Sequence, residues 1–148
     1  MTASDSLLER AIRIAVDAHE GQIYPTPVPQ PYILHPLRVM CALEGQWERV
    51  AGVLHDVVED TSVTLDHLRR AGFPPHLLHS IDCLTRRGGE TYSAYIERVA
   101  TDGTATRVKI ADLEDNLGNC RRLDRSPGAV KRIPRYEAAL ARLRPTVP

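Results

Sequence analysis

The stretch Ala51-Gly-Val-Leu-His-Asp-Val-Val-Glu-Asp60 carries most of the information in this chain. It has no proline, and its polar and apolar residues separate at helical spacing, which predicts a helix. On this helix His55 would lie one turn before Glu59. Asp56 would lie one turn before Asp60 in the same way. Burying an imidazole and three carboxylates on a mostly apolar helix is costly unless a cation or mutual hydrogen bonds compensate them. The pattern therefore indicates a metal site.

Composition limits the class of protein. The chain has 148 residues, of which 43% are hydrophobic and 26% charged, and it carries 19 acidic and 19 basic residues. This length predicts one domain over residues 1–148. The balanced charge argues against a sequence-independent grip on nucleic acid. No apolar run approaches the roughly 20 residues of a membrane span. The first residues lack the pattern of a signal peptide, so we expect a cytoplasmic protein that contacts neither nucleic acid nor membrane.

The three cysteines are far apart in the sequence. Cys41, Cys83 and Cys120 form neither a disulfide framework nor a CxxC zinc site. Free cysteine packs like a small hydrophobic residue. We therefore expect all three in or near the core, which agrees with a cytosolic location.

The remaining periodicity predicts an all-α fold. Period-two alternation is nearly absent, and apolar residues recur at helical spacing between glycine and proline breaks. The segment 22–31 holds four prolines and cannot be a regular helix. Ser6 and Glu9 resemble a capping box for the first helix. The predicted helices cover about 6–21, 36–43, 47–60, 64–71, 74–85, 91–100, 104–117 and 135–143.

Further candidate metal ligands lie outside the first stretch. His35 precedes Pro36 and would stand at the start of a helix. Asp112 lies on a helix where acids interrupt an apolar face, with Lys109 and Asn116 one turn to either side. His35, Asp112 and the His-Asp pair would form a shell of nitrogen and oxygen ligands. Such a shell suits Mn²⁺ or Fe²⁺. Zn²⁺ is less expected because the shell has no sulfur ligand, and Mg²⁺ is less expected because the shell has two imidazoles. Co²⁺ is a further alternative.

A metal held in this way can supply the chemistry of hydrolysis. A bound divalent ion lowers the pKa of a water molecule towards neutrality. Glu59 and Asp60 would then orient that water or shuttle a proton to the departing oxygen. Taken singly, His35 also fits a packing histidine at a helix start, and Asp112 a solvated helix acid. The other histidines are interpreted as surface or packing residues: His19, His67, His76 and His79.

Several motifs together carry a resemblance to a known family. The ordered motifs are Ala18-His19-Glu-Gly-Gln22, Pro31-Tyr-Ile-Leu-His35-Pro36, Leu54-His55-Asp56-Val-Val-Glu59-Asp60-Thr61, Leu84-Thr85-Arg86-Arg87, Glu90-Thr91-Tyr92 and Lys109-Ile-Ala-Asp112-Leu-Glu-Asp-Asn116. Over residues 8–140 they resemble the HD-domain phosphohydrolases. Within these they are most similar to the hydrolase domain of the Rel/Spo stringent-response proteins and to small alarmone hydrolases.

The resemblance implies a fold and roles for particular residues. It implies a helical bundle of the HD-domain type that removes pyrophosphate from the 3′ position of ppGpp or pppGpp. Glu59 and Asp60 match the pair that activates water, and Asn116 matches the residue near the substrate ribose. The residues that match the metal ligands, usually of Mn²⁺, are His35, His55, Asp56 and Asp112.

The chain departs from the family after Gln22. Family members typically place Arg, often with Lys, in this loop, where these residues contact guanine and phosphates. Here the sequence is Ile23-Tyr24-Pro25-Thr26-Pro27, with no cation before Arg38. Tyr24 can stack on a base, but it cannot replace a guanidinium as a bidentate phosphate partner.

Phosphate charge must then be met by other cations. Arg86, Arg87 and Lys109 are the candidates within the motifs, and Lys109 alternatively braces the metal ligands through a carboxylate. Further basic residues follow the last motif, and their alternative interpretation is a solvated face that pairs with neighbouring acids: Arg121, Arg122, Lys131, Arg132 and Arg135. Tyr92 and Tyr95 are interpreted as packing aromatics.

Three functions are compatible with these observations. The favoured hypothesis is a stand-alone, Mn²⁺-dependent ppGpp 3′-pyrophosphohydrolase with a small nucleotide substrate. The second is a phosphohydrolase of the same fold that acts on another nucleotide or phosphoester, which the altered loop favours. The third is a module that binds a nucleotide or partner protein without turnover. The presence of the full set of acidic and histidine residues argues against this third hypothesis. The sequence leaves the oligomeric state open.

Overall fold

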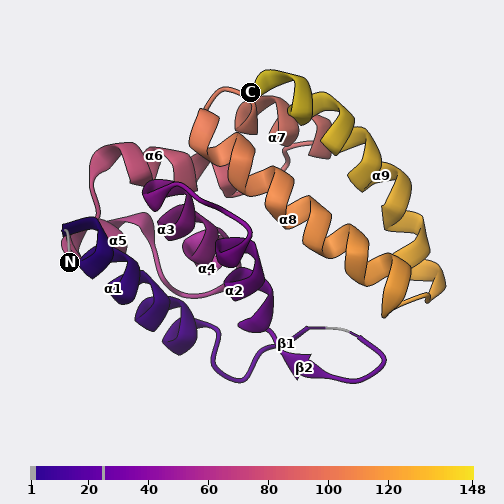
Figure 1. The fold of residues 1–148 in the computed structure, drawn as a ribbon, viewed down its shortest axis with the longest axis horizontal. Coiled ribbons are helices and arrows are strands. Elements are labelled where there is room, and N and C mark those ends of the chain that lie inside the picture. Colours follow the sequence, from indigo (N-terminus) through magenta and orange to yellow (C-terminus); the bar gives the residue numbers. More distant parts are fainter. Residues whose placement is uncertain (1–2, 25) are drawn as a thin grey trace.

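The computed structural model describes residues 3–24 and 26–148, and most of these residues are helical (Figure 1). The all-α prediction is confirmed, with one small two-stranded sheet added. The longer helices are α1 (Ala3–Ala18), α3 (Gln46–Leu54), α6 (Pro75–Leu84), α8 (Gly103–Arg122) and α9 (Pro127–Leu143). The shorter ones are α2 (Leu34–Cys41), α4 (Val57–Asp60), α5 (Leu65–Arg70) and α7 (Tyr92–Val99), and a 3-10 turn, η1, spans Arg144–Thr146.

Helix α3 lies at the centre of the packing. It contacts α1, α2, α6 and α8, while α9 packs along α8 on the outer side (Figure 1). Its last turn is fully buried, since Val50, Val53 and Leu54 have no exposed surface. Gly52 leaves room for the Leu43 side chain that follows α2, because a Cβ at this position would lie 2.8 Å from Leu43 Cδ1 and 3.5 Å from Met40 Cα of α2. This close packing brings the helix of His35 against the helix that leads into His55.

The segment after α1 forms a short hairpin that projects beside α2 (Figure 1). Strand β1 (Ile23–Tyr24) pairs antiparallel with β2 (Gln30–Pro31), with Ile23 opposite Pro31 and Tyr24 opposite Gln30. The expectation that 22–31 is not a regular helix is confirmed for its described residues. Pro25, within this segment, lies outside the described residues.

Several predicted helix ends are wrong, each because a local signal was misjudged. Helix α1 already includes Ala3, so Ser6 lies inside the helix and does not cap it. Helix α8 continues through Gly118 to Arg122, because Leu117 and Cys120 are buried where α8 packs on α9. Helix α9 begins at Pro127, well before the predicted start at 135. Proline is favoured at a first helical position, and the Ser126 side chain caps this helix by accepting a hydrogen bond from the Ala129 N–H.

The cysteines follow the prediction in two cases out of three. Cys83 and Cys120 are buried, whereas Cys41 is exposed, which corrects the expectation for that residue. Cys41 is the last residue of α2 and lies on the side of the helix turned from the core. Among the described residues, no helix is both long and apolar enough to cross a membrane.

Candidate active site

The His55-Asp56 pair lies at a break between two helices. The sequence predicts one continuous helix over 47–60, but α3 ends at Leu54 and α4 begins at Val57. The His55 ring nitrogen Nδ1 lies 2.6 Å from the Gly52 carbonyl oxygen, which a continuing helix would offer to the Asp56 amide. Adjacent residues of a regular helix do not face each other. At the break, His55 Nε2 and Asp56 Oδ2 come within 3.0 Å of each other.

The hydrogen bond at Nδ1 also decides which ring nitrogen of His55 is available to coordinate a metal. With Nδ1–H donating to the Gly52 carbonyl, Nε2 carries the lone pair. This Nε2 is buried and has no hydrogen-bond partner among the described residues, and the whole residue is 3% exposed. A buried ring nitrogen without a partner, directed at carboxylates, is the arrangement expected of a metal ligand.

His35 is oriented from the opposite side by an acid of α8. Its Nδ1 lies 2.7 Å from Asp115 Oδ2, and Arg38 holds both oxygens of Asp115 at 2.8 and 3.0 Å. The hydrogen bonds from His35 and Arg38 outweigh burial and lower the pKa of Asp115 to about 2. A carboxylate that fixes one nitrogen of a histidine directs the other nitrogen to the metal. His35 Nε2 accordingly faces Asp112 and Asp56.

Asp112 completes the cluster from the middle of α8. Its Oδ1 lies 2.9 Å from His35 Nε2 and 3.3 Å from His55 Nε2. Its Oδ2 accepts a hydrogen bond of 2.8 Å from Lys109 Nζ. Burial alone would raise the pKa of Asp112, but Lys109 and the two histidines hold it well below its ordinary value. Lys109 thus takes the bracing arrangement that the sequence left as its alternative.

The four predicted metal ligands therefore converge. His35, His55 and Asp56 each direct one ligand atom to a region in which these atoms lie within 4.8 Å of one another, and Asp112 Oδ1 lies beside both histidines. Burial lowers the pKa values of both histidines. The hydrogen bonds of His35 to Asp112 and Asp115, and the charges of Asp56 and Asp112 beside His55, nevertheless raise these pKa values above the ordinary value. Two imidazoles and two carboxylates at these distances can hold a divalent ion.

Glu59 and Asp60 lie next to this cluster on α4. Asp56, Glu59 and Asp60 form a second group of carboxylates within 4.8 Å. Burial, followed by the charges of Asp56 and Glu59, raises the pKa of Asp60 to about 6. Asp60 is thus poised to exchange a proton near neutral pH.

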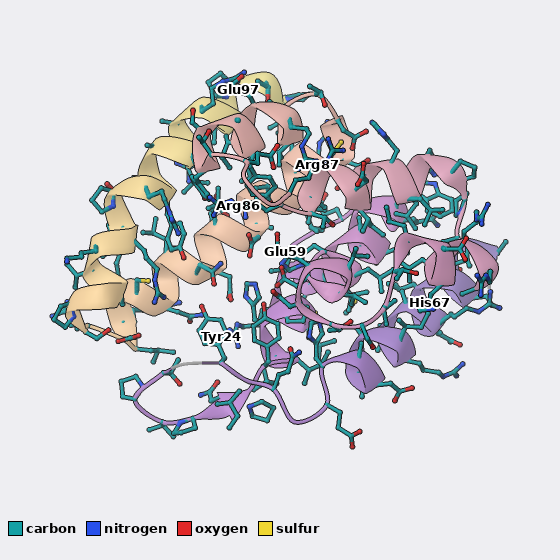
Figure 2. The ribbon with its side chains drawn as sticks, turned by 180° about the vertical axis from the view of Figure 1, so that it is seen from behind. Tyr24, Glu59, His67, Arg86, Arg87 and Glu97 are labelled. Carbon is teal, nitrogen blue, oxygen red and sulfur yellow. The ribbon has the colours of Figure 1, made fainter. Side chains whose placement is uncertain are left out.

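The loop after α6 holds Glu59 in place. The backbone N–H of Arg86 donates a hydrogen bond to Glu59 Oε1 at 2.7 Å, and Figure 2 shows the two residues close together. Arg98 anchors this loop from α7. Its guanidinium binds both oxygens of Glu90 at 2.9 Å and donates to the carbonyl oxygens of Asp82 and Thr85 at 2.8 and 2.7 Å.

Two tyrosines of the hairpin region close the other side of the cluster. The Tyr32 hydroxyl donates a hydrogen bond to Asp56 Oδ2. The Tyr24 hydroxyl donates to Asn116 Oδ1 at 2.6 Å, and Asn116 Nδ2 donates to Asp112 Oδ1 at 3.0 Å. The two tyrosine rings stack with centroids 6.0 Å apart. Burial raises the pKa of Tyr24 to about 12, so its hydroxyl remains a donor at neutral pH.

The remaining residues that were predicted to contact phosphate or to pack lie in different surroundings. The Arg86 side chain is exposed near Glu59, whereas the Arg87 guanidinium pairs with Asp82 at 3.1 Å, and Figure 2 shows it further from Glu59. Arg121 pairs with Glu137, as expected of a solvated face. His19 is buried and packs on the Tyr32 ring with centroids 4.9 Å apart, which agrees with a packing role.

Sequence reasoning missed Asp115, Tyr32 and Arg98 as parts of this site. Asp115 lies three residues after Asp112, a spacing that places both acids on neighbouring positions of one helical face. That spacing was the available signal for Asp115. Tyr32 and Arg98 act across long sequence separations, and nothing in their local pattern indicates their partners.

The chain is similar to known proteins in its sequence and in its fold. No family model matches the chain. It is 32% identical over 132 residues to a probable GTP pyrophosphokinase of Mycobacterium leprae, an alignment that covers 80% of this chain and 16% of the relative. It is 33% identical over 147 residues to a probable guanosine-3′,5′-bis(diphosphate) 3′-pyrophosphohydrolase of Synechocystis, covering 90% of this chain and 19% of the relative. The chain therefore spans less than a fifth of the length of these curated relatives.

One solved structure has a similar fold over nearly the whole of this chain. It is that of a metazoan ortholog of SpoT, a protein that hydrolyzes ppGpp and plays a role in starvation responses. The match has a TM-score of 0.71 at 20% sequence identity and covers 97% of this chain and 94% of that one. The bifunctional (p)ppGpp synthase/hydrolase SpoT of Escherichia coli is 40% identical over 67 residues, which are 43% of this chain and 9% of that protein. Over 80–90% of its length the chain is therefore homologous to part of the Rel/Spo family proteins, and it has the fold of the solved SpoT ortholog.

Proposed function

We propose that this chain is a metal-dependent ppGpp hydrolase that removes the 3′ diphosphate of guanosine 3′,5′-bis(diphosphate). The observation that carries the proposal is the convergence of four ligand side chains beside the Glu59-Asp60 pair. Two relatives whose names describe ppGpp hydrolysis, from Synechocystis and Escherichia coli, support the choice of substrate.

The metal in this proposal is Mn²⁺, held by His35, His55, Asp56 and Asp112. The mixed nitrogen and oxygen ligand set favours Mn²⁺ or Fe²⁺ over Zn²⁺ and Mg²⁺. When bound, such an ion supplies a water molecule of lowered pKa and polarises phosphoryl oxygens. The orphaned Nε2 of His55 supports this assignment independently of any relative.

The chain's own residues would position the water and move its protons. Glu59, held at Oε1 by the Arg86 N–H, keeps its second oxygen available to orient the attacking water. Asp60, with a pKa of about 6, can accept a proton and return it to the departing oxygen. Lys109 balances the charge of Asp112 and so braces this ligand, and we propose that it also adds positive charge towards the substrate phosphates.

The proposed nucleotide contacts surround this centre. Asn116 would meet the ribose, and Tyr24 would offer an aromatic face to the base. Arg86 would face the phosphates, whereas Arg87 would first have to leave the Asp82 carboxylate, with which it is paired. The Tyr24 hydroxyl occupies Asn116 Oδ1 in the structure, so a ribose hydroxyl would have to replace it as the donor.

A second candidate is hydrolysis of a different nucleotide or phosphoester at the same centre. The loop between Gln22 and Pro31 favours it, because this loop offers no lysine or arginine to phosphate or guanine. The metal chemistry is the same in both candidates. Only the groups beyond the reacting phosphate differ.

A turnover panel with Mn²⁺ tests the proposal. The full chain would be assayed with ppGpp, pppGpp, other 3′-phosphorylated nucleotides and 5′-phosphorylated nucleotides, with release of pyrophosphate or phosphate as the readout. We expect pyrophosphate from ppGpp, and none from the Asp56→Asn protein or after chelation. Turnover of other phosphoesters but not ppGpp would support the second candidate. Nucleotide binding without turnover of any compound would reject both in favour of a binding module.

A further inference from the structure

Two arginines from distant parts of the chain share one aromatic ring. Arg86, in the loop after α6, has its guanidinium carbon 5.7 Å from the centroid of the Tyr92 ring. Arg135, on α9, has its guanidinium carbon 4.4 Å from the same centroid and 5.8 Å from that of Tyr136. Cation–π contacts hold both cations against the ring. Two like charges that are far apart in the sequence therefore lie beside the same ring.

Within the described part of the chain, neither guanidinium is neutralised by an acid. Among these residues Arg135 has no ion pair or hydrogen bond, and the only acceptor of the Arg86 side chain is the Glu90 carbonyl oxygen at 3.3 Å. Three arginines nearby are paired: Arg87 with an aspartate, and Arg98 and Arg142 with glutamates. Arg132 of α9 also has no ion pair among the described residues, but it makes no contact with the Tyr92 ring in them. Two unpaired guanidiniums that contact one ring can together attract an anion.

The ring between them carries a further unused donor. The Tyr92 hydroxyl is buried and has no hydrogen-bond partner in residues 3–24 and 26–148, although most buried polar groups have one. Lys109, which bonds to Asp112 of the metal centre, lies close enough to Tyr92 to act on it electrostatically, as does Arg135. Positive charge thus lies near Tyr92 from three elements, and its buried hydroxyl has no acceptor among the described residues.

This cluster adjoins the proposed catalytic pair. The main chain of Arg86 bonds to Glu59, so the Arg86 side chain starts from the edge of the candidate active site (Figure 2). Both guanidiniums are exposed and can reorient. Arg86 therefore joins this cluster to the loop that holds Glu59.

We infer that Arg86, Arg135 and Tyr92 form a binding subsite for a phosphate group of the nucleotide substrate, separate from the metal ligands. The inference rests on the proposed function and deepens it, because it supplies the phosphate-binding cations that the loop at residues 22–31 lacks. Each guanidinium can donate two parallel hydrogen bonds to phosphate oxygens. The phosphate charge would in turn offset the repulsion between the two cations.

Equilibrium binding and kinetics on matched variants test the subsite. Inorganic pyrophosphate would be titrated calorimetrically into the full chain and into the Arg135→Gln, Arg86→Gln and Arg142→Gln variants. Arg142 is the matched control, since it is an arginine on the same helix as Arg135 that is already paired with Glu97. KM and kcat for ppGpp would be measured on the same proteins.

We expect Arg135→Gln and Arg86→Gln each to weaken pyrophosphate binding by about tenfold, the size of one charge-assisted hydrogen bond. Arg135→Gln should raise KM for ppGpp by a similar factor with kcat nearly unchanged, since the contact acts on ground state and transition state alike. Arg142→Gln should leave all three values within about twofold, the scatter expected for a surface substitution.

Two results would overturn the inference. Equal pyrophosphate affinity of the Arg135→Gln and Arg142→Gln variants would show that Arg135 does not contribute to an anion subsite. If the Arg86→Gln and Arg135→Gln variants bind pyrophosphate more weakly but keep the KM for ppGpp, the two arginines bind a free anion and not the substrate. The binding arm is independent of turnover, so a chain that hydrolyses no ppGpp but loses pyrophosphate affinity on Arg135→Gln would reject the proposed function and keep the anion site.

Discussion

The Arg86 amide donates a hydrogen bond to the Glu59 carboxylate at 2.7 Å, joining the loop after α6 to the short helix α4. A main-chain donor has no side-chain freedom, so it fixes one carboxylate oxygen in a single direction. The Arg86 amide leaves the other oxygen available, in a carboxylate group that lies beside Asp56 and Asp60. This contact makes the position of Glu59 depend on whatever holds the loop.

Glu59→Gln should separate proton transfer from metal binding. Glutamine keeps the shape and an oxygen that can accept the Arg86 amide, but it cannot take a proton. We expect kcat for ppGpp to fall on the order of 100-fold or more, with the manganese content near normal. Parallel measurement of kcat and of bound metal by mass spectrometry checks this. An unchanged kcat would show that Glu59 takes no part in the reaction.

Arg98→Met should act on Glu59 from a distance. Arg98 binds both oxygens of Glu90 and two carbonyl oxygens near the end of α6, so its loss frees the loop that carries the Arg86 amide. We expect kcat to fall by about 10- to 100-fold, as for a misplaced catalytic group. Arg142→Met is the control, because it removes an equally bidentate pair with Glu97 away from the loop.

A double-mutant cycle distinguishes positioning from a general loss of structure. If Arg98 acts through Glu59, Arg98→Met should cost little once Glu59→Gln is present. Thermal melts of all variants would be recorded, and kcat compared well below each midpoint. Fully additive losses would contradict a positioning role for Arg98.

Asp56→Asn should abolish bound metal and activity together. Asp56 Oδ2 lies 3.0 Å from His55 Nε2, and an amide there is a weak replacement for a charged ligand. Added Mn²⁺ should raise the melting temperature of the wild-type protein, because an ion that binds only the folded state stabilises it. The variant should show no such rise, while Asp17→Asn, at an exposed acid of α1, should respond like the wild type. Full activity of Asp56→Asn would reject the metal mechanism.

Asp60 should titrate near pH 6 in the metal-free protein. Burial and the charges of Asp56 and Glu59 raise its pKa to about 6 from the ordinary 3.8. The folded state therefore holds the proton more tightly than the unfolded state, and the contribution of Asp60 to stability decreases as pH rises from about 4 through 6. Carboxyl carbon NMR would measure this pKa. Asp56→Asn should lower it, because one repelling charge is gone, and an unshifted value would contradict the assigned cause.

Tyr24 should affect nucleotide recognition through both its hydroxyl and its ring. Tyr24→Phe releases Asn116 Oδ1, so a ribose hydroxyl no longer competes with the tyrosine, and KM for ppGpp should fall or stay level. Tyr24→Ala also removes the stacking face, which is worth roughly 1–3 kcal/mol per base, so KM should rise about fivefold or more. Equal KM values for both variants would exclude Tyr24 from base recognition.

The helical class and the identity of the candidate ligands follow from the amino-acid sequence without any structure. Helical spacing and the absence of period-two patterns were sufficient for the class. The motifs around His35, His55 and Asp112 indicated candidate metal ligands when taken together, whereas His35 and Asp112 taken singly also fitted ordinary structural roles. Helix ends were less well determined, since a proline such as Pro127 can begin a helix as well as interrupt one.

How these side chains meet depends on the packing of the helices. The break after Leu54 turns the adjacent His55 and Asp56 towards one point, which a continuous helix could not do. Asp115 behind His35 and Arg98 behind the Arg86 loop act through contacts between residues far apart in the chain. The local sequence predicts whether a segment forms a helix or a turn and which of its faces is buried. The relative positions of the candidate ligands, proton carriers and cations depend instead on which segments pack together around the core.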